Sequence, residues 1–289
     1  MTTSMPPPPP APSAATDLIP ARSPRAASVV AFRALLARDL AVTRKNLTRE
    51  VLPRTVIQPL LLVFVFTYVF PKIGQGVGGA AGDASGLFST QLVAGVISLA
   101  IVFQGIQSVA YPMVQEFGYT REIEDRVLAP LPVALVAFEK VIAGAILSSF
   151  SAVVVFPIAA FVPATPVNLE IDWPVLITMM PLGCVMAGAL GLMFGTRFEP
   201  RNVPILFGVI LLPLTFLGAI YYSWSALEPI RWLQLFVLVN PLVYLSEGFR
   251  AALTPSAHMS LWAIYGALVG FTSFFMWIGI RGFERRVVT

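Results

Sequence analysis

The stretch VIAGAILSSFSAVVVFPIAAF, residues 141–161, runs for its whole length without an acidic or basic side chain. A helix that crosses the hydrocarbon core of a bilayer needs about 20 mostly apolar residues. Because unpaired backbone N–H and C=O groups are costly in hydrocarbon, such a stretch has to satisfy them internally as a helix. The segment therefore predicts a transmembrane helix, and it decides the fold class of the chain.

Five further apolar stretches of similar length are predicted to cross the membrane, which makes six transmembrane helices. They are Val51–Phe70, Gln91–Tyr111, Pro174–Gly195, Val203–Tyr222 and Leu261–Ile280. Charged residues make up only 12% of the 289 residues, so little of the chain is left for a soluble domain. The predicted fold is an all-α membrane protein in which residues 29–289 form one transmembrane domain.

A seventh apolar run, Trp232–Leu245, is short and contains Asn240 followed by Pro241. Proline lacks a backbone donor and clashes with the preceding helical turn. The run therefore predicts a helix break at this point and a re-entrant or interfacial hairpin before the last span, rather than a crossing. Glu247 and Arg250 follow, three residues apart, and can pair on one helical face.

The distribution of lysine and arginine predicts the orientation. Most of the 19 basic residues lie before the first span, in the loops after the second and fourth spans, and after the last span. Cytoplasmic loops carry such an excess, so both termini are predicted to be cytoplasmic. The isoelectric point near 9.5 then reflects contact with the inner leaflet rather than with nucleic acid, because no basic patch with interleaved aromatic residues is present.

Two segments precede the first span. Residues 1–28 are rich in proline, alanine and serine, which predicts a disordered cytoplasmic tail. They lack the apolar region of a cleaved signal peptide. In Val29–Glu50, apolar residues recur near helical spacing and basic residues occupy the remaining face. This pattern predicts an amphipathic helix in the headgroup region, with an ordinary solvated helix as the alternative.

The sequence lacks the residues that several chemistries require. No Gly-Lys pair is present, so a Walker A loop for ATP cannot form. The glycines at 74, 76 and 79 match a dinucleotide motif only formally, because they follow a membrane span instead of a strand. The single histidine, His258, and the single cysteine, Cys184, cannot build a His/Cys metal site. We therefore predict no catalytic residue, no metal ligand and no enzyme activity in this chain.

Ionisable side chains are almost absent from the span interiors. Arg54, Glu139 and Lys140 lie at span ends, where long side chains can reach the interface. Gln104 and Gln107 share a helix face, so they either line a translocation path or hydrogen-bond to a neighbouring helix. The lack of an intramembrane carboxylate disfavours an ion-coupled secondary transporter.

Small residues recur at every fourth position on two spans. They are Gly183, Ala187, Gly191 and Gly195 on the fourth span and Gly266 and Gly270 on the last. This spacing lets helix backbones approach closely. It predicts helix packing, either within the chain or between two copies of it.

Two polar segments complete the pattern. The first, QEFGYTREIEDRVLAPLP at residues 115–132, joins the second and third spans and predicts a short helix at the cytoplasmic surface. The second, NPLVYLSEGFR at residues 240–250, precedes the last span. With the interfacial first helix, the six spans and these segments in this order, the chain from residue 29 onward resembles the permease subunit of ABC-2-type exporters, which include antibiotic-resistance and lipo-oligosaccharide exporter permeases.

The resemblance implies a multi-pass protein of the bacterial cytoplasmic membrane that carries no cofactor itself. A separate ABC ATPase, in two copies, would bind ATP and Mg at the cytoplasmic face, and a second permease copy or a related permease would complete the path. The expected function is ATP-driven export of an amphipathic drug-like or lipid-like substrate. Export of a polysaccharide or a lipid-linked glycan is the alternative.

The resemblance also assigns roles to the two polar segments. Residues 116–128 would be a coupling helix that docks on the ATPase, with a solvated loop helix as the alternative. Its candidate contacts are Glu116, Arg121, Glu122, Glu124, Asp125 and Arg126. Residues 229–253, with Asn240, Pro241, Glu247 and Arg250, would re-enter from the outer side and cap the path.

Overall fold

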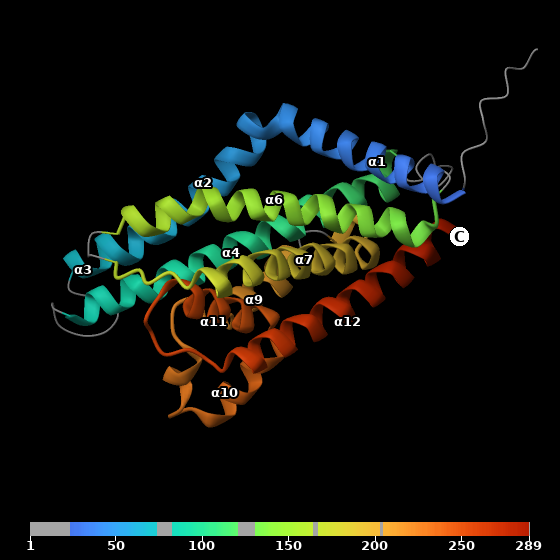
Figure 1. The fold of residues 1–289 in the computed structure, drawn as a ribbon. Helices are drawn as coiled ribbons and strands as arrows, with labels where there is room; N and C mark the ends of the chain where they lie inside the picture. Colours follow the sequence, from blue (N-terminus) through green and yellow to red (C-terminus); the bar gives the residue numbers. More distant parts are fainter. Residues whose placement is uncertain (1–23, 74–82, 121–130, 164–166, 203–204, 289) are drawn as a thin grey trace, which may run out of the picture.

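The computed structural model describes residues 24–73, 83–120, 131–163, 167–202 and 205–288. The regular structure in these ranges is helical, as predicted (Figure 1). Most of the predicted tail, residues 1–23, lies outside them, whereas residues 24–28 already belong to the first helix. In chain order the elements are α1 (Pro24–Asn46), η1 (Leu47–Val51), α2 (Leu52–Phe64), η2 (Val65–Val69), α3 (Phe70–Lys72), α4 (Asp83–Gln115), η3 (Glu116–Thr120), α6 (Val133–Phe161), α7 (Trp173–Arg197), η4 (Pro200–Asn202), η5 (Leu206–Leu211), α9 (Leu212–Phe216), η6 (Trp224–Leu227), α10 (Arg231–Phe236), η7 (Val237–Val239), α11 (Pro241–Leu253) and α12 (Leu261–Val288).

Five of the described helices are long and apolar enough to cross a membrane, and one bent pair would make a sixth. These five contain five of the six predicted spans, apart from Phe70 at the end of the first, and the five are thereby confirmed as helices. The first of them joins α1 to α2 with a visible bend between the two (Figure 1), so the place of α1 in the headgroup region stays a prediction. Their bounds are Arg25–Val69, Phe88–Gly118, Val133–Phe161, Trp173–Arg197 and Leu261–Val287.

The remaining predicted span, Val203–Tyr222, is wrong in its last third. The described helix there consists of η5 and α9 and ends at Phe216. Even at the 1.5 Å per residue of an α-helix, its 6 and 5 residues would rise only about 17 Å, which is little more than half of the roughly 30 Å hydrocarbon core. The chain then turns at Ala219, whose φ of 53° is a left-handed conformation that ends a helix.

Helices α4, α6 and α12 each pack against α7, and glycine brings α4 and α7 into close contact. A Cβ atom on Gly191 of α7 would lie 2.7 Å from the carbonyl oxygen of Gly105 on α4, and one on Gly195 would lie 3.0 Å from Cα of Ala110. The small-residue stripe on α7 therefore packs within the chain. On α12, no atom lies within 4 Å of a Cβ built at Gly266 or Gly270, so that stripe faces away from the described residues.

Side-chain contacts along α7 and α12 show that these helices run in the same direction. The hydroxyl groups of Thr178 and Tyr265 lie 2.5 Å apart near one end, and Gly282 contacts Thr196 near the other. The chain between them therefore returns once along the bundle, through the segment that contains η5 and α9. This return corresponds to the predicted span, but its described helical part, η5 and α9, is not among the helices long enough to cross a membrane.

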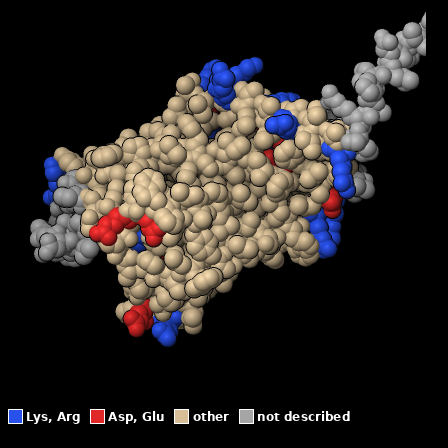
Figure 2. Space-filling view, in the orientation of Figure 1, with Lys and Arg blue, Asp and Glu red and all other residues tan. Residues whose placement is uncertain are grey.

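The beginning of α1 and the end of α12 lie at the same end of the bundle (Figure 1). We call this the inner end and the opposite one, which holds α10 and α11, the outer end. On the face shown in Figure 2, charged side chains gather towards the two ends, and the broad area between them is largely free of charge. This distribution suits a molecule whose middle section lies in hydrocarbon.

Candidate functional site

Two buried charges lie on α11 at the outer end. Glu247 and Arg250 are 1% and 0% exposed, and the Arg250 guanidinium donates to Glu247 Oε1 at 2.5 Å. The pairing predicted from their spacing is thus confirmed. A charge buried this deeply is tolerated only when it is both paired and hydrogen-bonded, which directs attention to the other partners of the two side chains.

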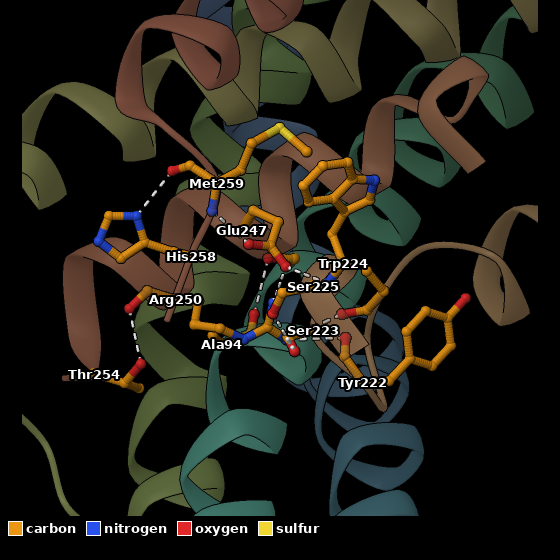
Figure 3. Close-up of polar contacts among 12 residues, drawn as sticks. Ala94, Tyr222, Ser223, Trp224, Ser225, Glu247, Arg250, Thr254, His258 and Met259 are labelled. Carbon is orange, nitrogen blue, oxygen red and sulfur yellow. Dashed lines mark hydrogen bonds and ion pairs between the residues drawn. The ribbon is translucent and has the colours of Figure 1, made fainter. Parts of the chain in front are cut away.

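Four backbone groups supply those partners, and Figure 3 labels the residues of three of them, Tyr222, Trp224 and Met259, around the pair. Two carbonyls from the turn after α9 accept from the guanidinium, and two N–H groups, one from η6 and one preceding α12, donate to the carboxylate. We call this arrangement the outer network. Its bonds run from Arg250 to the oxygens of Ala219 (3.1 Å) and Tyr222 (3.3 Å), and to Glu247 from the nitrogens of Trp224 (2.8 Å) and Met259 (2.8 Å).

The outer network also explains why the predicted fifth span ends early. A regular helix would use the carbonyl of Ala219 for its own backbone ladder. Here the left-handed turn directs that carbonyl to Arg250 instead. A side chain that is distant in sequence therefore fixes the local backbone, and α11, the turn after α9 and the start of α12 are held together at one point.

The helix break predicted at Asn240–Pro241 is present. Arg231–Val239 and Pro241–Leu253 meet at 98°, and the Asn240 side chain caps α11 by accepting from the N–H of Leu242 at 2.9 Å. Pro241 begins the new helix, where its missing N–H removes no helical hydrogen bond. The Asn240 amide also donates to the carbonyl of Leu214 in α9 at 2.8 Å. Re-entry of this bent pair from the outer side of a membrane stays a prediction.

A second group of buried charges lies towards the inner end, where three helices meet. The Lys140 ammonium on α6 donates to Asp39 Oδ2 on α1 at 2.9 Å and to Glu116 Oε1 at the start of η3 at 2.8 Å. Lys140 is only 5% exposed. We call these three residues the inner triad. The expectation that Lys140 reaches the membrane interface is therefore wrong, because its ammonium turns inward to two carboxylates.

The inner triad borders a partly open cavity of about 240 Å³ that is lined by residues of α1, α4 and α6 and by Glu116. Arg38, Thr43 and Ser108 add polar groups to its wall, and Val42 and Leu147 add apolar ones. Glu139, next to Lys140, is fully buried as well. The inner end thus contains a polar, incompletely filled junction between helices that are far apart in the sequence.

One of the predicted coupling residues belongs to this junction. Glu116 is buried and ion-paired with Lys140, so one of its oxygens is directed into the chain. Its contact with an ATPase stays a prediction. The other five candidates lie outside the described residues: Arg121, Glu122, Glu124, Asp125 and Arg126.

The two glutamines proposed for a translocation path both bond to α2. Gln104 accepts from the Thr55 hydroxyl at 3.3 Å, and Gln107 accepts from the Arg54 guanidinium at 3.0 Å. Hydrogen bonding to a neighbouring helix, one of the two predicted roles, is therefore confirmed. Both residues also line a small cleft between α2 and α4, together with Gln58, so a role in a path stays a prediction.

The lone histidine and cysteine have local roles. His258 lies exposed in the loop before α12, with its ring nitrogen 2.8 Å from the carbonyl of Met259. Cys184 is buried in α7, and its sulfur accepts from Ser149 at 3.3 Å. Within the described ranges, no group of three His, Cys, Asp or Glu side chains is arranged to hold a metal ion.

Sequence reasoning missed Asp39 and the inward position of Lys140. Asp39 is an acidic residue in a stretch, Val29–Thr48, whose other charged residues are basic. Lys140 directly follows Glu139, so two charged residues stand side by side in an otherwise apolar stretch. Each was a signal of a buried partner. The sequence nevertheless could not pair them, because 101 positions separate them.

Comparison with known proteins identifies the family. The model of the ABC-2 type transporter family matches residues 30–254. An inner membrane transport permease of Escherichia coli K12, YadH, is 27% identical over 221 residues, which cover 75% of this chain and 82% of that protein. The protein of the same name from Shigella flexneri matches to the same extent. Because the family match covers most of the chain, including the inner triad and the Glu247–Arg250 pair, the chain belongs to the ABC-2 type transporter family.

Proposed function

We propose that the chain is the permease subunit of an ATP-driven exporter in the bacterial inner membrane, and that it moves an amphipathic, lipid-like or drug-like substrate outward. Family membership supports a partnership with an ABC ATPase, which would bind ATP and Mg on the inner side. The similarity to proteins named inner membrane transport permeases supports the location and the transport role.

The exposed face of α2 is the observation that carries the proposal about the substrate. Near the inner end this face presents Arg54 and Gln58 beside the exposed Ile57. Towards the outer end it presents Leu61 and Phe64, followed by Tyr68 of η2. A charged and polar section followed by an apolar and aromatic one is a poor match for lipid tails alone, because polar groups in hydrocarbon are costly. It suits a molecule with a polar head and an apolar body.

A second permease copy, or a related permease, would face this surface and complete the path. The cleft between α2 and α4 would then open towards the dimer seam, with Gln104 and Gln107 on its floor. The neutral amides can hydrogen-bond to a polar group in passing without the strong attraction of a buried charge.

At the outer end, the bent pair and the outer network would close the path between transport events. The network fixes α11 against the turn after α9 and against the start of α12. At the inner end, binding of ATP would draw the two ATPase copies together and move the predicted coupling segment that begins at Glu116. The helices of the two permeases would tilt in response and open the outer side.

Two other functions are alternatives to the export of an amphipathic substrate. Export of a polysaccharide or a lipid-linked glycan uses the same machinery and differs in the width of the path. An ion-coupled carrier would need an intramembrane ion site, whereas the buried carboxylates described here are each paired with a cation or lie beside one.

Purification of the full chain from the inner membrane of its own host, in a mild detergent, tests the proposal. We expect an ABC ATPase to copurify, recognisable by mass spectrometry of a peptide with a Walker A sequence, and the complex to hydrolyse ATP. After reconstitution into vesicles, ATP should drive movement of a fluorescent phosphatidylethanolamine or of a hydrophobic cationic dye between the leaflets.

A lipid-linked oligosaccharide is the matched probe for the alternative. ATP-driven movement of this probe without movement of the other two would favour glycan export. Movement of any probe by the permease alone, driven by a proton or sodium gradient and unaffected by ATP, would contradict the proposed function.

A further inference from the structure

The inner triad joins three elements through one ammonium group. Asp39 lies in α1, Glu116 begins the segment that follows α4, and Lys140 lies in the second turn of α6. Both N–O distances are below 3 Å. A displacement of any one element therefore acts directly on a charge in the other two.

Burial shows that the triad is more than a surface ion pair. The side chains of Lys140, Glu116 and Asp39 are 5%, 10% and 16% exposed. A buried ion pair is often no more stabilising than an apolar replacement of the same size, although removal of one partner is strongly destabilising. Stability alone therefore gives little reason for three charges to lie here.

The chemistry of lysine suits a contact that moves. Its ammonium carries three rotatable donors on a flexible four-carbon stem, so it can keep both carboxylates bound while the helices shift. The adjoining cavity of about 240 Å³ leaves room for such a shift. Between α4 and α7, in contrast, the close contact of Gly191 with Gly105 leaves almost none.

We infer that the inner triad is the joint through which movement of the cytoplasmic segment starting at Glu116 reaches the membrane helices. Glu116 receives the displacement, Lys140 passes it to α6, and Asp39 passes it to α1. The three side chains are thus positioning residues of the transport cycle. This inference rests on the proposed function, because the displacement comes from an ATPase bound at the inner end.

The test uses the copurified complex and three variants, in a background in which the single cysteine, Cys184, is replaced by alanine. The main variant neutralises the whole triad (Asp39→Asn, Glu116→Gln and Lys140→Met together), so that no member is left charged without the other two. Asp39→Asn alone keeps the balanced pair of Lys140 and Glu116. Thr43→Ala, which lines the same cavity without a charge, is the control.

Each protein carries a spin label at the exposed residue Val239, and the distance between labels in the two copies is measured without nucleotide and after trapping with MgATP and vanadate. In the wild type and in Thr43→Ala, trapping should shift this distance. In the neutral triple variant the ATPase should still copurify and still trap nucleotide, while the shift is lost. Asp39→Asn should reduce the shift at unchanged melting temperature.

The outcomes separate the inference from the proposed function. A full shift in a folded triple variant, or in Asp39→Asn if the triple variant does not fold, would overturn the inference and leave the proposed function intact. Failure of the wild type to retain any ATPase would overturn both. Loss of the shift in Thr43→Ala as well would also count against the inference, because the cavity rather than the charges would then be responsible.

Discussion

The outer network and the inner triad are both buried groups of opposite charges, yet they are built differently. In the outer network, Arg250 and Glu247 bond to four backbone groups as well as to each other. In the inner triad, the two partners of Lys140 among the described residues are both side-chain carboxylates. Backbone partners cannot turn away when a helix moves, whereas side-chain partners can follow.

The two regions also differ in what they connect. The outer network joins segments that lie within 40 positions of one another, from Ala219 to Met259, and it shapes a turn and a helix start. The inner triad joins α1 to α6 across 101 positions and borders a cavity. From this difference we expect the outer end to be a fixed assembly and the inner end to be a junction whose parts can be displaced.

The largest effect is expected from Arg250→Met, which tests the fixed character of the outer end. The change leaves Glu247 buried without a counter-charge, and loss of one partner of a buried pair typically lowers the free energy of unfolding by about 3–5 kcal/mol. Denaturant unfolding in detergent, followed by circular dichroism, measures it. Arg231→Met, at an exposed site on α10, should change little, and a wild-type midpoint for Arg250→Met would contradict this account of the outer network.

The next largest effect concerns the close packing of α4 against α7, between the two regions. Gly191→Ala places a methyl group 2.7 Å from the Gly105 carbonyl oxygen and should lower stability by about 1–3 kcal/mol, as overpacking does. Gly270→Ala, where the added atom meets nothing within 4 Å, is the matched control and should be neutral or slightly stabilising. Equal melting temperatures for the two variants would show that α4 and α7 are less tightly joined than described.

A smaller effect is expected at the break before α11. Asn240→Ala removes both the cap of α11 and the bond to Leu214, and loss of an N-cap costs about 1 kcal/mol. Asn240→Asp keeps the capping oxygen and removes the amide donor, so it should lie between the alanine variant and the wild type. If Asn240→Asp is as unstable as Asn240→Ala, the bond to α9 rather than the cap fixes the break.

The smallest effect belongs to the polar contact between α2 and α4. A double-mutant cycle of Thr55→Val and Gln104→Leu should give a coupling energy of about 0.6 kcal/mol, the average for hydrogen bonds between membrane helices. Unfolding of the four proteins under one set of conditions supplies the value. A coupling energy indistinguishable from zero would remove this contact from the packing of α2 and leave Gln104 available for a path.

Much of the fold could be predicted because the bilayer imposes it locally. Length and apolarity alone located the helix that contains residues 141–161, and the chemistry of Pro241 located the break in the bent pair. The pairing of Glu247 with Arg250 was predictable for the same reason, since three positions on one helix are neighbours in space.

The features that the sequence did not predict depend on partners that are distant in the sequence. The helix expected to reach Tyr222 stops at Phe216, and the turn that follows is held by Arg250, which no local pattern places near Ala219. Lys140 was expected at the interface because it lies at the end of a predicted span, where a long side chain can reach the headgroups. Asp39 and Glu116 become its partners only once α1, α4 and α6 have packed together.

The most direct test of the contrast between the two regions measures two distances in the same ATPase complex by pulsed electron paramagnetic resonance. One label pair, at Val42 on α1 and Leu135 on α6, spans the inner triad, and the other, at Val239 and Trp262, spans the outer network; all four sites are exposed. Labelled protein is diluted with unlabelled protein so that each distance lies within one chain. Trapping with MgATP and vanadate should change the Val42–Leu135 distance and leave the Val239–Trp262 distance unchanged. A changed outer distance with an unchanged inner one would contradict the account.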